Sequence, residues 1–370
     1  MSNSIYIILF PNPLRDNMTK AKVKVPTNIA FVKYWGKNPN WEKYHIPTKS
    51  SVSFTTDGLY TTTEVEVKKG NSKINFNLNG KHISPEMPEF EYVKEFFDKF
   101  FELYPNIKNY DYKIVTENNF PTAAGFASSA SGFAALVMAT VKALENEFGE
   151  NALSDDKLSA IARLGSGSAT RSIPYAGGIV KWDRGITPET KFDESKMNEV
   201  IYSSYAKTIV PPEQLEDIVM IYTHVEKKEK KVKSRAGIKT SLKTCPVYYD
   251  WVNHEENVII PKVLELVKKK DWSGLFDVIM ECSNALHAVM MYTQPTIVYL
   301  NDQSFEIINA VLNINDKHGK TVCAYTYDAG PNAIVFTTKQ YKNEVVSELE
   351  KILGKEGLFV TKVGKGPEYL

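Results

Sequence analysis

The 370-residue chain has only three cysteines and no long hydrophobic run. Cys245, Cys282 and Cys323 are widely separated and lack metal-ligand spacing, so we expect neither a disulfide framework nor a zinc site. The apolar run at residues 5–10 is too short to cross a bilayer and follows no basic segment, so we expect no signal peptide or membrane anchor. These features fit a reducing, cytoplasmic setting.

The chain also has no marked excess of positive or negative charge. Lys and Arg total 45 against 44 Asp and Glu, a formal net charge of +1, which gives no support for a nucleic-acid or anionic-membrane partner. Any anion site must therefore be local and built by a few residues.

The order of the hydrophobic patterns predicts an α+β protein. The first third alternates apolar and polar residues as strands do, with a hairpin signal at Asn79-Gly80, and residues 90–104 carry an aromatic stripe at helical spacing. The second half alternates helical patterns with short strands, which favours α+β over a doubly wound sheet. We expect helices at about 261–270, 275–291, 303–314 and 340–352, and strands at 218–225, 322–327, 333–337 and 358–363.

We divide the chain into three parts. Residues 1–20 form a leader or an extra strand, with Met18 as an alternative natural start, residues 21–205 form an N-terminal lobe, and residues 206–370 form a C-terminal α+β lobe. The division falls where polar residues precede the paired prolines Pro211-Pro212.

The segment 121–132, PTAAGFASSASG, follows a strand pattern and leads into an apolar helical pattern. A helix N-terminus offers free N–H groups and the positive end of the helix dipole, and small residues let an anion approach the backbone. The segment lacks both the lysine of a P-loop and the glycine spacing of a dinucleotide fold. Taken alone, it fits a phosphate site and an ordinary helix start capped by Ser128 or Ser129 equally well.

Three further segments carry candidate chemistry. Lys33 and Lys37 lie among aromatic residues, which suits an anion site but also a surface pair. Residues 165–172, GSGSATRS, combine small residues with Arg171, whose planar guanidinium matches a carboxylate or phosphate, although a plain loop is the simpler interpretation. Asp328 ends an apolar strand before a Gly-Pro turn, where it serves either as a turn residue or as a base.

One dense charge run, EKKEKKVK at 226–233, is most simply a solvated helix face. It lies next to Ser234 in the sequence, so a contact with a phosphate stays open.

Taken together, the segments PTNIAFVKYWGK, HIPTKSSVS, NNFPTAAGFASSASGFAALV, GSGSATRS and YDAGPN, in this order, resemble the mevalonate diphosphate decarboxylase family. This family belongs to the superfamily of galactokinase, homoserine kinase, mevalonate kinase and phosphomevalonate kinase. The resemblance covers residues 21–370, and YWGK and YDAGPN are more specific to the decarboxylases than the phosphate loop is.

The resemblance implies a fold and an activity. The fold has two lobes and a deep active-site cleft; the N-terminal lobe is like the second domain of a small-subunit ribosomal protein, and the C-terminal lobe is ferredoxin-like. The activity uses ATP and Mg²⁺ to convert mevalonate 5-diphosphate into isopentenyl diphosphate, CO₂, ADP and phosphate, and the protein is expected to be a homodimer.

The resemblance also implies roles for individual residues. Asp328 resembles the catalytic aspartate beside the C3 hydroxyl, Arg171 the arginine that holds the substrate carboxylate, and Lys33 the lysine that supports the reacting phosphoryl group. The implied substrate-binding residues are Asn28, Tyr34, Lys37, Ser166, Ser168 and Ser234. The implied ATP-binding residues are Ala123, Ala124, Gly125, Ala127, Ser128, Ser129 and Ala130, with Ser129 as the candidate Mg²⁺ contact.

Physical chemistry supports these roles. Phosphoryl transfer depends on positioning and charge stabilisation more than on covalent help from the protein. A carboxylate at position 328 need only orient the hydroxyl and accept a proton that leaves late. The phosphorylated tertiary hydroxyl then becomes a leaving group, and its departure draws electrons from the C–CO₂⁻ bond.

The chain departs from the family pattern at several positions. Lys49 stands in place of the usual asparagine, Thr170 in place of the usual cysteine, and residues 173–176 form a slightly longer segment. We expect an added cation and a longer segment to reshape the substrate pocket.

Four alternative functions stay open. They are decarboxylation of mevalonate 5-phosphate, ATP-independent decarboxylation of mevalonate 3,5-bisphosphate, mevalonate 3-kinase activity, and non-catalytic ligand binding; either of the first two would give isopentenyl phosphate. Lys49 keeps the bisphosphate substrate open. The presence of Asp328 and Lys33, which 3-kinases tend to lack, favours decarboxylation of the diphosphate.

Overall fold

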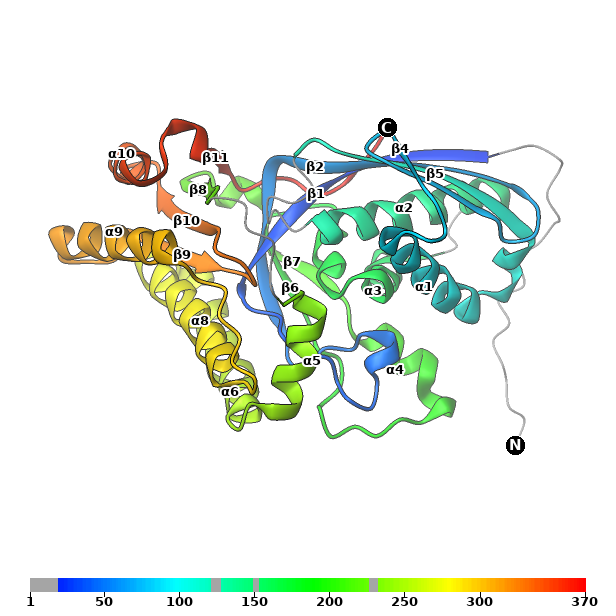
Figure 1. Cartoon of the computed structure of the whole chain (residues 1–370), viewed down its shortest axis with the longest axis horizontal. Coiled ribbons are helices and arrows are strands. Elements are labelled where there is room, and N and C mark those ends of the chain that lie inside the picture. The colour runs from blue at the N-terminus through cyan, green and yellow to red at the C-terminus, as the bar shows by residue number, and fades with distance from the viewer. Residues whose placement is uncertain (1–18, 121–127, 149–152, 226–231) are drawn as a thin grey trace.

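The computed structural model describes residues 19–120, 128–148, 153–225 and 232–370. Two β-sheets with helices packed on them form a mixed α+β fold (Figure 1), which confirms the expected class. Most of the predicted leader, the predicted ATP-binding residues Ala123, Ala124, Gly125 and Ala127, and most of the charge run at 226–233 lie outside the described residues.

The larger sheet has the order β12-β1-β2-β5-β3-β4, and β6 joins it by pairing with β2 and β7. Its two long strands are antiparallel, with a register that runs from Thr19↔Val67 to Val32↔Val52. Alternate residues along the outer part of β2 are buried, as expected for a sheet with helices on one face. The strands are β1 (Thr19–Val32), β2 (Ser51–Lys69), β3 (Ile74–Leu78), β4 (Lys81–Ile83), β5 (Tyr110–Asn118), β6 (Ile179–Trp182), β7 (Ala206–Val210) and β12 (Glu368–Tyr369).

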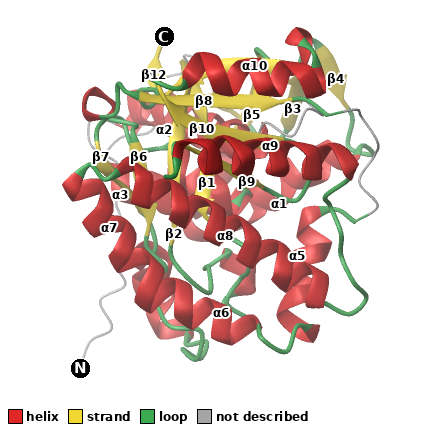
Figure 2. Ribbon diagram, turned by 90° about the vertical axis from the view of Figure 1, so that its left-hand side faces the viewer, coloured by secondary structure: helices red, strands yellow, loops and turns green. Residues whose placement is uncertain are grey.

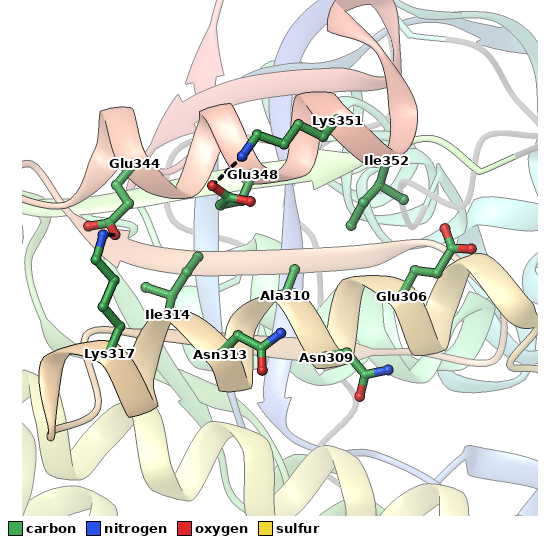
Figure 3. Close-up of a pocket in the computed structure, with 10 residues that line it drawn as sticks. All are labelled: Glu306, Asn309, Ala310, Asn313, Ile314, Lys317, Glu344, Glu348, Lys351 and Ile352. Carbon is green, nitrogen blue, oxygen red and sulfur yellow. Dashed lines mark hydrogen bonds and ion pairs between the residues drawn. The ribbon is translucent and has the colours of Figure 1, made fainter.

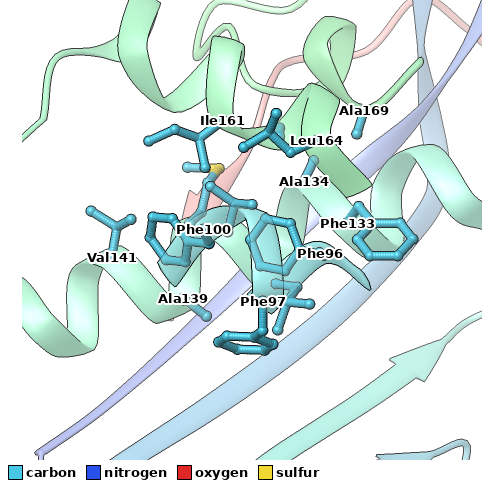
Figure 4. Close-up of a cluster of buried hydrophobic side chains, with 14 of the residues drawn as sticks. Phe96, Phe97, Phe100, Phe133, Ala134, Ala139, Val141, Ile161, Leu164 and Ala169 are labelled. Atoms are coloured by element: carbon cyan, nitrogen blue, oxygen red, sulfur yellow. The ribbon is translucent and has the colours of Figure 1, made fainter. Parts of the chain in front are cut away.

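Helices α1 (Pro88–Leu103), α2 (Ser128–Phe148) and α3 (Asp155–Gly165) cover this sheet, and α4 (Met197–Ser203) packs beside α3. Figure 4 shows the core that they share, in which the aromatic stripe of α1 meets Phe133 of α2. The stripe is therefore a packing face, as its helical spacing predicts. Short helical turns lie at η1 (Glu42–Tyr44), η2 (Pro105–Asn109), η3 (Gly167–Ser172), η4 (Glu194–Lys196) and η5 (Pro212–Gln214).

The second sheet has the order β11-β8-β10-β9 and is antiparallel throughout. Strands β8, β9 and β10 are almost wholly buried because helices cover both faces: α9 and α10 pack on one side and α7 and α8 on the other (Figure 2). These strands are β8 (Ile218–Thr223), β9 (Cys323–Tyr327), β10 (Ala333–Thr338) and β11 (Leu358–Lys362).

The helices of this half are α5 (Ser234–Thr244), α6 (Tyr248–His254), α7 (Ile260–Lys269), α8 (Trp272–Tyr292), α9 (Asp302–His318) and α10 (Lys342–Leu353). A π-helical turn, η6 (Glu255–Ile259), joins α6 to α7, and η7 (Lys355–Gly357) precedes β11.

One hydrophobic cluster joins the two sheets. Phe54 of β2 lies 4.9 Å from Phe31 of β1 and 5.0 Å from Phe336 of β10, measured between ring centroids. Residues of α8 complete the same cluster. The end of β1 is therefore fixed against the second sheet, and this contact positions the candidate site described below.

Most sequence-based expectations for these elements are confirmed. The four predicted helices and four predicted strands of the second half are present within a few residues of their expected bounds. The hairpin at Asn79-Gly80 joins β3 to β4, and the positive φ angles of both residues, 49° and 76°, fit a type I′ turn. The division between the lobes stays a prediction; β7, placed in the C-terminal lobe, pairs with β6 in the larger sheet.

All three cysteines are free and buried. Within the described ranges, no helix is both long enough and apolar enough to cross a bilayer.

We predict that Phe97→Ala destabilises the protein by about 3–5 kcal/mol, the usual cost of truncating a buried aromatic ring. Phe97 is fully buried, and its ring lies 4.7 Å from Tyr112 and 5.2 Å from Phe96. Denaturant unfolding measures the loss, with the exposed Phe305→Ala as control. A loss below about 1 kcal/mol would contradict this account of the core.

Candidate active site

An ion pair between Lys33 and Asp328 forms the centre of the site. Lys33 directly follows β1 and Asp328 directly follows β9, so strand ends from the two sheets meet here. Nζ of Lys33 lies 2.7 Å from Oδ1 of Asp328. The lysine side chain is only 1% exposed, whereas the aspartate side chain is 45% exposed, so the carboxylate is the partner that a ligand can reach.

Burial lowers the pKa of Lys33, and the adjacent Asp328 carboxylate opposes this shift by attraction and hydrogen bonding. The attraction of Asp328 favours the charged form of Lys33 against the cost of burial. The ammonium can therefore stabilise negative charge beside the same carboxylate, the combination that a phosphoryl acceptor site needs.

Arg171 supplies a second buried cation. Its Nη1 donates to Oγ of Ser51 at 2.7 Å, and its guanidinium lies 5.7 Å from the ring centre of Trp182. Burial lowers the pKa of Arg171 to about 10, with Asp328 partly compensating, so the side chain is charged at neutral pH. These neighbours fix the orientation of the planar guanidinium, which suits a carboxylate ligand.

Asn28 positions Arg171. Its Oδ1 accepts from Nε of Arg171 at 3.2 Å, while its Nδ2 donates to Oγ of Ser172 at 2.8 Å and to the carbonyl of Ser168 at 3.2 Å. Asn28 is buried and its amide bonds to protein on both sides. In this structure the predicted substrate-binding Asn28 thus holds the segment 168–172 in place.

The predicted phosphate helix meets the second small-residue segment. Oγ of Ser129, at the start of α2, lies 3.3 Å from Oγ of Ser166, which lies 3.2 Å from Oγ of Ser168. Ala130 behind them is buried. Nothing is described for the side chain of Ser128, which begins the helix. Ser129, predicted for ATP, and Ser166 and Ser168, predicted for the substrate diphosphate, therefore form one hydroxyl row.

Tyr34 faces the same segment. Its ring packs 4.9 Å from that of Trp182, and a Cβ added to Gly167 would lie 2.7 Å from ring atoms of Tyr34, so only glycine allows this approach. Burial raises the pKa of Tyr34, which keeps its hydroxyl protonated. Among the described residues, this buried hydroxyl has no hydrogen-bond partner, as expected of a donor reserved for a ligand.

A cluster of cations borders the hydroxyl row. Burial, followed by the nearby charges of Arg235 and Lys99, lowers the pKa of Lys37 to about 8. Arg235 lies at the start of α5, beside the predicted Ser234, and its Nη2 donates to the carbonyl of Gly165 at 3.2 Å. Three cations gathered in this way suit a multiply charged anion.

His45 supports this cluster without adding charge. Burial and the nearby lysines lower its pKa well below 6.5. Nζ of Lys99 donates to Nε2 of His45 at 3.2 Å, so Nδ1 carries the proton and donates to the carbonyl of Arg163 at 2.8 Å.

His287 lies near the central ion pair. Burial, followed by repulsion from Lys33, lowers the pKa of His287 to about 4, so the ring is neutral at pH 7 and a weak base. It packs edge-on against Tyr327, 6.0 Å away. His287 is buried, whereas the Asp328 side chain is 45% exposed, so Asp328 is the proton acceptor that a ligand can reach.

Lys49 does not add a cation to the substrate side, and the expectation that its charge reshapes the substrate pocket is wrong. Its side chain is 1% exposed, and Nζ lies 3.0 Å from Oε2 of Glu255, itself 1% exposed. The charge is neutralised inside the protein.

The described residues fit ATP and Mg²⁺ as reactants. They contain no group of three or more His, Cys, Asp or Glu side chains suited to a resident metal. Mg²⁺ usually keeps several waters and binds through substrate phosphates with one or two protein oxygens. Ser129 and the partly exposed carboxylate of Asp328 can supply such oxygens.

A hollow of about 560 Å³ lies elsewhere, between α9 and α10 (Figure 3). It is lined by mixed charges, including a hydrogen bond from Lys351 to Glu348 and one from Lys317 to Glu344. None of the predicted site residues lines it.

Several site residues were missed by the sequence analysis. Arg235 could have been found, since it follows the predicted Ser234 at a helix start. Lys99 lies inside the aromatic stripe of α1, so only the tertiary structure reveals it. His45 begins the segment HIPTKSSVS, but neither His45 nor His287 was given a role from the sequence.

Comparisons with known proteins give one consistent result. The family described as Diphosphomevalonate decarboxylase-like N-terminal domain matches residues 25–193, and the Mevalonate 5-diphosphate decarboxylase C-terminal domain matches residues 218–358. The diphosphomevalonate decarboxylase of Ganoderma lucidum is 36% identical over 347 residues, covering 90% of this chain and 82% of the relative. That of Saccharomyces cerevisiae is 32% identical over 347 residues, with the same coverage.

Solved structures agree. Mevalonate diphosphate decarboxylase from Staphylococcus aureus superposes with a TM-score of 0.82 at 30% identity, covering 96% of this chain and 98% of that one. A structure described as MDDEF in complex with MVAPP, AMPPCP and magnesium has a TM-score of 0.81 at 32% identity, covering 96% and 99%.

We predict that inorganic pyrophosphate binding depends on the protonation of Lys37. A group with a pKa of about 8 is roughly nine-tenths charged at pH 7 and roughly one-tenth at pH 9, so the wild-type affinity should fall about tenfold relative to Lys37→Arg. The arginine variant stays charged and corrects for titration of pyrophosphate itself. Calorimetric titration at both pH values measures the ratio; a ratio independent of pH would remove Lys37 from the anion site.

Proposed function

Because the chain belongs to the diphosphomevalonate decarboxylase family, we propose that it converts mevalonate 5-diphosphate and ATP into isopentenyl diphosphate, CO₂, ADP and phosphate. The observation that carries this proposal is the 2.7 Å ion pair of Lys33 and Asp328, with the charged Arg171 buried nearby. Asp328 can accept a proton, Lys33 can stabilise a phosphoryl group, and Arg171 can bind a carboxylate.

Asp328 acts on the C3 hydroxyl in this proposal. Its exposed oxygens accept a hydrogen bond from the hydroxyl, orient that oxygen toward the γ-phosphoryl group of ATP and take its proton as the new P–O bond forms. Lys33 compensates the negative charge on the transferring oxygens. Lys33 is paired with this carboxylate in the structure without substrate.

Arg171 directs the second stage. When the C3–O bond of the phosphorylated intermediate breaks, the electron pair of the C–CO₂⁻ bond becomes the alkene, and CO₂ and phosphate leave. Arg171 must hold the carboxylate in the direction that aligns this bond without over-stabilising its charge. Its bonds to Asn28 and Ser51 fix the guanidinium and keep it from following the carboxylate.

The remaining groups bind the two phosphate chains. Tyr34, Lys37, Ser166, Ser168 and Ser234, with Arg235 added from the structure, hold the substrate diphosphate. Ser128, Ser129 and Ala130 begin the helix whose N–H groups receive the ATP phosphates, together with the segment 123–127. Ser129 is the proposed Mg²⁺ contact, and Mg²⁺ offsets the charge of the ATP phosphates.

The buried pairing of Lys49 weakens the case for a bisphosphate substrate. That alternative depended on an extra cation facing the substrate, and the cation is paired with Glu255. Within the described chain, the charges bordering the hydroxyl row, Lys37, Lys99 and Arg235, suit a diphosphate better than a single phosphate.

A homodimer and a cytoplasmic location are also part of the proposal. The family resemblance supports the homodimer, and light scattering on the purified protein tests it. The three unpaired cysteines are consistent with a reducing compartment.

A substrate series with CO₂ trapping tests the function. The protein is incubated with mevalonate, its 5-phosphate, its 5-diphosphate and its 3,5-bisphosphate, each with and without ATP and Mg²⁺. We expect CO₂ and ADP in a 1:1 ratio, fastest with the 5-diphosphate and absent without ATP. ADP without CO₂, or CO₂ without ATP, would contradict the proposal.

We predict that Asp328→Asn lowers kcat by about 10²–10⁴-fold, the usual contribution of a general base. Substrate binding should change little, because the amide keeps the shape of the carboxylate. Stopped assays give kcat and calorimetry gives the affinity. The exposed Asp98→Asn on α1 is the control; near-wild-type turnover of Asp328→Asn would refute the assigned base.

A further inference from the structure

A buried ion pair outside the reacting groups contacts the backbone of Lys33. Nζ of Lys49 lies 3.0 Å from Oε2 of Glu255, and both side chains are 1% exposed. The same ammonium donates to the main-chain carbonyl of Lys33 and, at 3.4 Å, to that of Ser50. Its three protons thus have three acceptors, and one of them belongs to the central lysine of the site.

The carbonyl of Lys33 lies where β-sheet pairing stops. The β1–β2 register ends at Val32↔Val52, so Lys33 follows the last residue pair of the ladder. The Lys49 ammonium reaches this carbonyl from the segment just before β2. The Lys49 ammonium therefore fixes the backbone one residue beyond the end of β1. That residue is Lys33, whose side chain pairs with Asp328.

Glu255 is itself fixed from the second half of the chain. It opens the π-helical turn η6 between α6 and α7, and its Oε1 accepts from Nε1 of Trp251 at 3.0 Å. The Trp251 ring also lies 4.7 Å from Nζ of Lys49, at cation–π distance. Such π-helical turns often occur at functional sites.

Stability alone does not account for this pair. Taking two charges out of water costs about as much as their attraction returns, and an apolar pair of similar volume is commonly as stable. A buried pair whose cation also contacts a reacting residue has a more specific use. Catalytic groups must be held within about 0.5 Å, and a displacement of about 1 Å can lower the rate about 100-fold.

We propose that Lys49 and Glu255 are positioning residues that set the backbone of Lys33, and through it the position of the Lys33 ammonium against Asp328 and the transferring phosphoryl group. The pair joins the segment before β2 to the α6–α7 junction. The position of the Lys33 backbone therefore depends on how the α6–α7 junction packs against this segment. This inference rests on the proposed function, because phosphoryl transfer and CO₂ release are its readout.

The test uses two single variants and one double variant of the full chain. Lys49→Met removes the donor to the Lys33 carbonyl but leaves Glu255 as an unpaired buried charge. Glu255→Gln keeps an acceptor for Trp251 and removes the charge. In Lys49→Met/Glu255→Gln neither charge remains, so we expect a melting temperature above that of Lys49→Met.

We expect kcat to fall about 10- to 100-fold in Lys49→Met and in the double variant, with KM for mevalonate diphosphate within about threefold of wild type. The diagnostic result is that the double variant regains stability but not kcat, because its Lys33 carbonyl still lacks the donor. Glu256→Gln is the matched control: Glu256 lies in the same turn but bonds to the main-chain N and Oγ of Ser50, at 2.7 and 2.9 Å. Its kcat should stay within about threefold of wild type.

Two results would overturn the inference. One is a kcat in the double variant within about threefold of wild type, which would give the pair a structural role only; this result decides the matter even where Lys49→Met fails to fold. The other is an equal loss of kcat in Glu256→Gln. Wild-type turnover, measured first, separates a failure of this inference from a failure of the proposed function.

Discussion

The ion pair between Lys33 and Asp328 is the interaction on which the site depends. The two residues are 295 positions apart in the sequence, and each follows the end of a strand, one in each sheet. The strand ends meet because one hydrophobic cluster joins the two sheets through Phe31, Phe54 and Phe336. Packing of the apolar residues thus determines where the charges lie.

Other polar contacts near the pair orient it and supply positive charge. Asn28 and Ser51 fix Arg171, and Lys49 reaches the backbone of Lys33. Burial raises the free energy of a charged side chain, and it lowers the pKa values of Lys33, Lys37 and Arg171 for this reason. An anionic substrate bearing a carboxylate and a diphosphate would compensate these charges on binding.

The sequence predicted the local features and missed the ones made by tertiary contacts. The hairpin at Asn79-Gly80 and the position of Asp328 at a strand end follow from short-range rules of turn and strand chemistry. Lys49 was misjudged because its partner Glu255 is 206 residues away, and no local pattern tells a buried, paired lysine from an exposed one. Lys99 was hidden in a helix whose apolar stripe explains its pattern without it. The roles of Ser128, Ser129 and Ser234 came from the family resemblance and stay predictions.

A crystal structure of this protein with mevalonate 5-diphosphate, AMPPCP and Mg²⁺ tests the central claim most directly. The account predicts the C3 hydroxyl oxygen within about 2.6–3.2 Å of a carboxylate oxygen of Asp328. It also predicts the Lys33 ammonium next to the γ-phosphoryl group, the substrate carboxylate on Arg171, and the diphosphate among Tyr34, Lys37 and Arg235. A substrate bound the other way round, with its diphosphate on Arg171 and its hydroxyl remote from Asp328, would contradict it.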